Sequence, residues 1–165
     1  MKWKNLVVGV DGSASSRAAL QWAYDVALAQ NAELTTLMTW RPVPPPPSGS
    51  ASTYNPEYDD TDQAAVAEKE LLEIIRDELG DDPAVLIRPK VLAGRAAKAL
   101  IDASQDADLL VVGSRGIGGF AGMLLGSVSQ HVAAHAVCTV VVVRSPSGDE
   151  SATVADGLSS SDDPS

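Results

Sequence analysis

Apolar and polar positions follow two kinds of pattern in this chain, and these patterns take turns along its length. Short runs rich in apolar or β-branched residues predict strands at 6–10, 34–40, 84–90, 108–112 and 139–143. Apolar residues at helical spacing predict helices at 14–30, 59–79, 95–104 and 127–136. In the helix at 59–79, the apolar face is expected to consist of Val66, Leu71, Leu72, Ile75 and Leu79. Strands that alternate with helices indicate βαβ units, and therefore an α/β fold.

Five strands in this arrangement predict a single three-layer domain whose parallel sheet has the flavodoxin-like order 3-2-1-4-5. In that order the strands at 6–10 and 108–112 are neighbours, and the direction of winding reverses between them. Ligands of such sheets bind at the reversal, beyond the carboxyl ends of the strands. Asp11 and Gly113 end these two strands. We therefore expect two distant segments to meet in one crevice.

The segment after the fourth strand has the composition of an anion site. It reads Gly113-Ser-Arg-Gly116, then nine residues, then Gly126-Ser127 at the start of a predicted helix. Glycine lets backbone N–H groups approach a ligand closely, because no Cβ intervenes. A helix N-terminus adds unpaired N–H donors and a partial positive charge. Together they favour phosphate.

Each of these residues also has a purely structural interpretation. Asp11 competes with Ser13 for the N-cap of the first helix, and the glycines could serve only a tight turn. Ser127 could be an N-cap as well as a phosphate ligand, and Ser129 could be a polar residue of the first turn. His131 and His135 share a helix face, but no third histidine completes a zinc site, so His135 is expected to contact the last carbonyls of its helix.

Composition narrows the functional classes. The length of 165 residues and the hydrophobic content of 45% suit one globular domain. No run of 18 apolar residues indicates a membrane span, and the first residues do not resemble a signal peptide. Cys138 is the only cysteine, so an internal disulfide is excluded, in agreement with a cytoplasmic location. The net charge of −10 argues against binding to nucleic acid or anionic membranes.

Two segments depart from the α/β pattern. Residues 41–58 contain a run of four prolines, which predicts a long loop, either a mobile flap or a polyproline segment that docks a partner. Residues 145–165 are rich in serine and acids and predict a disordered tail after a domain that covers 1–144. The tail has five acids and no base, and residues 41–62 have four acids and one base, so the rest of the chain is nearly neutral.

The motif spacing G-2x-G-9x-G-S resembles the nucleotide-binding signature of the universal stress protein family. The resemblance covers about residues 3–144 and includes the opening Val7–Ser13 and the closing Cys138–Arg144. Family members that bind ATP keep these glycines. The resemblance thus implies a Rossmann-like domain of the adenine nucleotide α-hydrolase type that binds ATP, or a related adenine nucleotide, with Mg²⁺.

The resemblance also implies roles for particular positions. Asp11 would lie near the ribose and the metal-bound phosphates, the backbone of Thr39 would meet adenine, and no residue is assigned a catalytic role. The expected nucleotide-binding residues are Gly9, Val10, Asp11, Ser13, Thr39, Val112, Gly113, Arg115, Gly116, Gly126, Ser127, Val128 and Ser129.

Three functions follow from these observations and the resemblance. The first is a regulatory ATP-binding protein of the stress response, which the resemblance implies to be a homodimer through the valine-rich edge strand Thr139–Val143. The second is an enzyme with slow ATP hydrolysis or self-phosphorylation at Ser127 or Ser129. The third is a dimeric adaptor that binds no nucleotide and recognises a protein partner through the 41–62 region or the tail.

Overall fold

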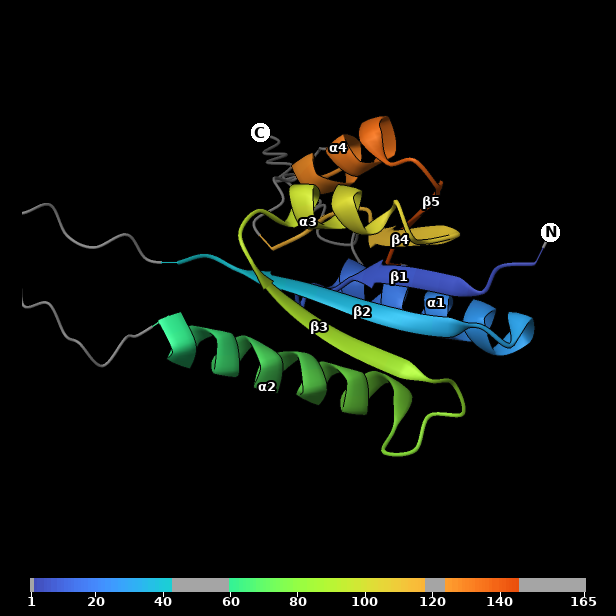
Figure 1. Cartoon of the computed structure of the whole chain (residues 1–165), viewed down its shortest axis with the longest axis horizontal. Helices are drawn as coiled ribbons and strands as arrows, with labels where there is room; N and C mark the ends of the chain where they lie inside the picture. Colours follow the sequence, from blue (N-terminus) through green and yellow to red (C-terminus); the bar gives the residue numbers. More distant parts are fainter. Residues whose placement is uncertain (1, 43–59, 118–123, 146–165) are drawn as a thin grey trace, which may run out of the picture.

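Five parallel strands form one sheet in the order β3-β2-β1-β4-β5 (Figure 1). The computed structural model describes residues 2–42, 60–117 and 124–145. The strands are β1 (Asn5–Gly9), β2 (Glu33–Trp40), β3 (Ile87–Ala93), β4 (Leu109–Gly113) and β5 (Thr139–Val143). The predicted order is confirmed, and β1 and β4 are neighbours, as the expected crevice requires.

Helices cover both faces of the sheet. They are α1 (Ala14–Gln30), α2 (Asp60–Leu79), α3 (Ala96–Ala103) and α4 (Ser127–His135). Figure 1 shows α1 and α2 on one face and α3 and α4 on the other. This is the three-layer arrangement that the alternation of strands and helices predicted.

The pleat of the strands divides the apolar residues between two cores. On the face of α1 and α2, residues such as Val8 of β1 and Val111 of β4 pack with the small, fully buried Ala19 and Ala23 of α1. On the other face, Val7 and Leu110 pack with Leu100 of α3 and Val132 of α4. Successive residues of a strand point to opposite faces, so one apolar run supplies both cores.

Helix α1 is bounded by residues suited to its ends. Ser13 is the N-cap, and its side chain accepts a hydrogen bond from the N–H of Ser16. Asn31 is the C-cap in the left-handed conformation, with φ 52°. The helix therefore begins directly behind the end of β1, where Asp11 lies.

Two local expectations are wrong. The third strand spans Ile87–Ala93 rather than residues 84–90, and Ala84 lies before it, with its N–H donated to the hydroxyl of Tyr24 on α1. On α2, Val66 and Leu72 are 65% and 43% exposed, whereas Ala67 and Ile74 are buried. Apolar residues occur on more than one side of α2, and only one side packs against the sheet. The packing therefore decides which of them are buried.

Residues 43–59, which contain nearly all of the predicted Pro-rich loop, lie outside the described residues, as do residues 146–165 of the predicted tail. None of the helices in the described part of the chain combines the length and the apolar character needed to span a bilayer.

Candidate functional site

Residues at the carboxyl ends of β1, β2 and β4 and at the N-termini of α3 and α4 line a pocket of about 440 Å³. It lies at the predicted reversal of strand order. Asp11 and Ser127, although 116 positions apart in the chain, both line it. The other predicted site residues in its lining are Gly9, Val10, Thr39, Val112, Gly113, Arg115, Gly116, Gly126, Val128 and Ser129. Of the predicted set, only Ser13 is absent from the lining.

Five lining residues were missed by sequence reasoning: Ser16, Leu37, Ala96, Leu100 and Ile117. Leu37 had a usable signal, because it shares a strand face with Thr39, two residues further on. No sequence signal pointed to Ala96 and Leu100 of α3, because they belong to no motif and do not end a strand. Their position follows only from how α3 packs over the end of the sheet.

One part of the pocket is apolar. Val10, Leu37, Leu100 and Val112 line it, and each is at most 4% exposed. They come from β1, β2, α3 and β4, so their relative positions are set by the sheet and the helix above it. Such a surface accepts a flat, weakly hydrated group by removing it from water.

Another part of the pocket is formed by the N-terminus of α4. Gly126, its N-cap, donates its N–H to the carbonyl of Ser114 at 2.7 Å. The first bond within the helix runs from the N–H of Gln130 to the carbonyl of Gly126 at 3.0 Å. The N–H groups of residues 127–129 therefore have no carbonyl acceptor within the described chain. Three free donors and the positive end of the helix dipole favour an anion here.

Ser129 fastens this helix end to the sheet. Its hydroxyl donates to the carbonyl of Gly113 at 2.6 Å, and the side chain is buried. This bond commits the only hydroxyl proton of Ser129 to the protein itself. Ser129 therefore positions α4 over the end of β4, although it also contributes to the pocket wall.

Asp11 links the end of β1 to the loop after β4. Its Oδ1 accepts bonds from the N–H and the hydroxyl of Ser13, at 3.0 and 2.6 Å, and its Oδ2 accepts the N–H of Ile117 at 3.1 Å. Ser13, not Asp11, caps α1, which resolves their competition. A carboxylate thus already lies at the N-terminus of α1, whereas the N-terminus of α4 lines the pocket with N–H groups that are free for an external anion.

Two of the motif glycines also make room for neighbouring parts of the protein. A Cβ on Gly113 would lie 2.6 Å from the backbone carbon of Ser15, and one on Gly116 would lie 2.6 Å from Oδ2 of Asp11. These two glycines therefore let parts of the protein itself come close together. At Gly126, the nearest atom to an added Cβ would be 3.4 Å away, so the constraint there is weaker.

Arg115 brings the only positive side chain to the described lining. Its backbone is held by the first turn of α1: the N–H donates to Ser15 Oγ at 3.3 Å, and the carbonyl accepts a bond from the hydroxyl of Ser15. Asp11 and Arg115 are the two ionisable residues among the lining residues that the structure describes. The pocket thus has little net charge of its own.

The two histidines of α4 pack on each other outside the pocket. The rings of His131 and His135 lie 4.4 Å apart, and Nδ1 of His135 is 2.9 Å from the carbonyl of His131. The expected contact of His135 with the helix carbonyls is confirmed. Within residues 2–42, 60–117 and 124–145, no three metal-binding side chains come together.

Comparison with known proteins places the chain in a family. The family model described as the universal stress protein family matches residues 2–144. The universal stress protein Rv2623 of Mycobacterium tuberculosis (strain ATCC 25618 / H37Rv) is 38% identical over 139 residues, which make up 84% of this chain and 44% of that protein. The chain spans about half the length of the curated relatives it matches.

Solved structures share the fold. The universal stress protein UspA of Lactobacillus plantarum has a TM-score of 0.68 at 24% identity, covering 87% of this chain and 99% of that one. A universal stress protein solved in complex with cAMP has a TM-score of 0.61 at 28% identity, covering 88% and 99%. The chain belongs to the universal stress protein family.

Proposed function

We propose that this chain binds an adenine nucleotide in the pocket and acts as a regulatory nucleotide-binding protein in a stress response. The observation that carries the proposal is that an apolar wall and a helix N-terminus with free N–H groups belong to one pocket. A purine base needs the first and a phosphate needs the second. The relative solved with cAMP supports the same ligand class.

In this proposal the base occupies the apolar part beside Leu37 and Leu100, and the backbone of Thr39 lies at its edge. The ribose lies near Asp11 and Val112. The phosphates meet Arg115 and the N–H groups at Ser127, Val128 and Ser129. A pocket of about 440 Å³ lies in the range of small-molecule sites.

We further propose ATP as the ligand, with Mg²⁺ as the partner of its phosphates. The described lining provides one carboxylate, Asp11, whose oxygens already accept three hydrogen bonds. Mg²⁺ prefers six oxygen ligands, so this residue set suits a metal that arrives with a polyphosphate rather than one held by the protein alone. Asp11 is the residue that would hold it, and the metal would neutralise phosphate charge.

The same residues favour binding over catalysis. Hydrolysis of ATP needs a group that positions or activates water and groups that stabilise the developing charge. Asp11 is the only candidate base in the described lining, and hydrogen bonds from Ser13 and Ile117 engage both of its oxygens. We therefore expect any turnover to be slow compared with exchange of the nucleotide.

Isothermal titration of ligand-free protein with Mg-ATP, AMP and cAMP tests the proposal. Ala96 lines the pocket and its neighbour Ala97 does not, and both are half-buried, so they form a matched pair. Ala96→Met should weaken binding by at least about tenfold by filling the pocket, whereas Ala97→Met should change it by less than about twofold. No heat with any adenine nucleotide would favour the adaptor function instead.

We also propose a homodimer through β5. The two edges of the sheet differ in character: β3 carries Arg88, Pro89 and Lys90, whereas β5 has only valine after Thr139. Charges and proline protect an edge strand from pairing, and an unprotected valine-rich edge invites it. Within the described residues, β5 pairs only with β4, on one side.

Sedimentation of Thr139→Lys tests this interface, because Thr139 is exposed and its replacement leaves the core intact. We expect the wild type to sediment as a dimer and the variant as a monomer. Ala93→Lys, on the exposed end of the opposite edge strand, is the control and should remain dimeric. A dimeric Thr139→Lys variant, or a monomeric wild type, would contradict the proposed pairing.

A further inference from the structure

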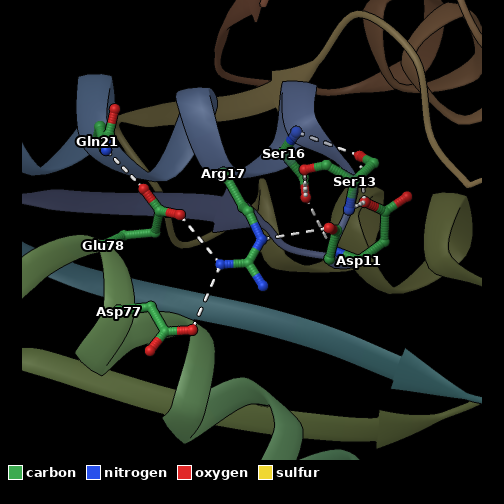
Figure 2. A network of polar contacts seen from close by, with 8 residues as sticks. Asp11, Ser13, Ser16, Arg17, Gln21, Asp77 and Glu78 are labelled. Atoms are coloured by element: carbon green, nitrogen blue, oxygen red, sulfur yellow. Dashed lines mark hydrogen bonds and ion pairs between the residues drawn. The ribbon is translucent and has the colours of Figure 1, made fainter.

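A chain of charged and polar contacts connects α2 to the turn that follows β1 (Figure 2). Nη1 of Arg17 on α1 lies 3.0 Å from Oε1 of Glu78 and 3.7 Å from Oδ2 of Asp77, both near the end of α2. Nε of the same guanidinium donates to the carbonyl of Gly12 at 3.3 Å. Gln21 donates to the other carboxylate oxygen of Glu78. One arginine therefore holds a helix end and a turn together.

The peptide unit between Gly12 and Ser13 continues this chain into the pocket. Its carbonyl accepts the bond from Arg17, and its N–H donates to Oδ1 of Asp11 at 3.0 Å. The other oxygen of Asp11 accepts the N–H of Ile117. The contacts thus run without a break from Glu78 on α2 to the loop after β4.

We propose that Arg17 is a positioning residue of the nucleotide site, an inference that rests on the proposed function. Arg17 lies outside the pocket lining, so it acts through the Gly12–Ser13 peptide. With the carbonyl held by Arg17, the N–H on the other side of the peptide points at Asp11. Asp11 in turn holds Ile117 at the mouth of the pocket. The position of α2 is thereby transmitted to the residues that would meet ribose and phosphate.

The physical chemistry of Arg17 suits this role. A guanidinium presents several N–H donors in a rigid planar fork, so it can serve a carbonyl and a carboxylate at once. The Glu78 side chain is only 16% exposed and needs its partner, because a mostly buried carboxylate without one is costly. Asp77, at 63% exposed, contributes less.

The Gly12 turn itself needs such a restraint. Gly12 has φ +82°, a conformation open to glycine because it lacks a Cβ, and glycine is also the residue most free to leave it. A peptide held on one side by a cation and on the other by a carboxylate is also polarised, which strengthens both bonds. Loss of Arg17 would release the carbonyl and weaken the contact to Asp11.

Amide hydrogen exchange of the nucleotide-free protein tests the restraint directly. In Arg17→Gln, the N–H groups of Ser13 and Ile117 should exchange about tenfold faster, while the core amides of Leu110 and Val111 keep their wild-type rates. Arg88→Gln is the matched control, because it removes another arginine–carboxylate pair, with Glu33, away from the pocket. Unchanged exchange at Ser13 and Ile117 in Arg17→Gln would overturn the inference.

Nucleotide affinity tests the consequence for the site. Arg17→Gln should raise the dissociation constant for AMP about tenfold but that for free adenine less than about twofold, because adenine lacks the ribose and phosphate that the turn serves. Equal loss for both ligands, or no loss for either, would overturn the positioning role. Glu78→Gln keeps Arg17 but removes its charged partner, so it should change the amide exchange rates and the AMP affinity in the same direction. This variant replaces Arg17→Gln in both tests if Arg17→Gln does not fold.

The two proposals fail separately. A wild type that binds no adenine nucleotide overturns the proposed function, and the exchange measurement still decides whether Arg17 restrains the turn. A wild type that binds nucleotide while Arg17→Gln matches it in exchange and affinity overturns the inference alone.

Discussion

Gly113 and Gly126 carry the same residue type for different physical reasons. At Gly113 an added Cβ would meet the backbone of the first turn of α1 at 2.6 Å, which no side-chain rotation can relieve. At Gly126 the nearest atom would be 3.4 Å away, and φ is −70°, which any residue adopts. Gly113 is thus needed for the close packing of β4 against α1. Gly126 has no such packing constraint within the described residues.

We predict that Gly113→Ala lowers the free energy of unfolding by about 1–3 kcal/mol, the usual cost of overpacking. Gly126→Ala should cost less, at most about 1 kcal/mol, since the chain has room for the methyl group and only the poorer N-cap propensity of alanine counts against it. Urea denaturation of both variants measures the difference. Equal stability of the two would mean that α1 can shift away from β4 at little cost.

Thr36 poses a different question at the residue scale. It is fully buried in β2, and its Oγ1 has no hydrogen-bond partner among the described residues. A buried hydroxyl without a partner loses its bonds to water and gains nothing in return. We predict that Thr36→Val, which keeps the shape, raises the free energy of unfolding by about 1 kcal/mol.

Thr35→Val is the control for this change, because Thr35 is the half-buried neighbour that points to the other face of the sheet. It should leave stability nearly unchanged in the same denaturation experiment. A destabilised Thr36→Val variant would show that the hydroxyl has a partner in solution.

Among the secondary-structure elements, β1 and β4 are joined by a side chain as well as by their ladder. Oδ2 of Asp108 accepts the N–H groups of Lys4 and Asn5 at 2.7 and 2.9 Å, just before the two strands begin to pair. These two bonds hold the pKa of Asp108 below its ordinary value, against a smaller opposing effect of desolvation. The carboxylate therefore contributes to stability only while it is charged.

The sign of the pH dependence follows. Because the folded-state pKa of Asp108 is lowered, its contribution is fully present above the unfolded value, near 3.8, and is lost as the pH falls through the folded value. We predict that Asp108→Asn melts at a lower temperature than the wild type at pH 6 and that the gap closes below about pH 4. Asp106→Asn, two residues earlier and exposed, should show no such gap in the same thermal scans.

At the scale of the whole molecule, charge opposes an anionic ligand. The chain carries a net charge of −10, and the described pocket lining contributes one carboxylate and one guanidinium. The residues between 117 and 126 in the sequence add no charge. The free N–H groups at the N-terminus of α4 add a positive feature equivalent to about half an elementary charge, and the N-terminus of α3 also borders the pocket.

We predict that ATP binding depends on Mg²⁺ far more than AMP binding does, because a triphosphate brings more charge than the site can offset. Replacing Mg²⁺ by EDTA should raise the dissociation constant for ATP by at least about tenfold and that for AMP by less than about twofold. Titration calorimetry under both conditions measures this. ATP affinity that is insensitive to EDTA would mean that the site finds another cation in the chain.

Much of the architecture follows from pattern alone. The apolar runs and helical spacings predicted the nine elements found in the described residues, because each pattern reflects which faces of an element are buried. The order of the sheet followed from the alternation of strands and helices, which is typical of flavodoxin-like domains. Knowledge of the strand order was then enough to predict that Asp11 and Gly113 meet. The bounds of β3 were predicted three residues too early, because Ala84 and its neighbours have an apolar character but Ala84 bonds to Tyr24 of α1, a contact between elements that periodicity does not reveal.

What the sequence by itself determined are the elements, their order and the residues that end the strands, because these depend on periodicity and on local turn chemistry. Tertiary structure alone decided that Leu100 walls the pocket, that Gly113 makes room for α1, and that Arg17 joins α2 to the Gly12 turn. The reason is physical. Periodicity defines a direction within one element, whereas a contact between elements depends on how each face packs against the others.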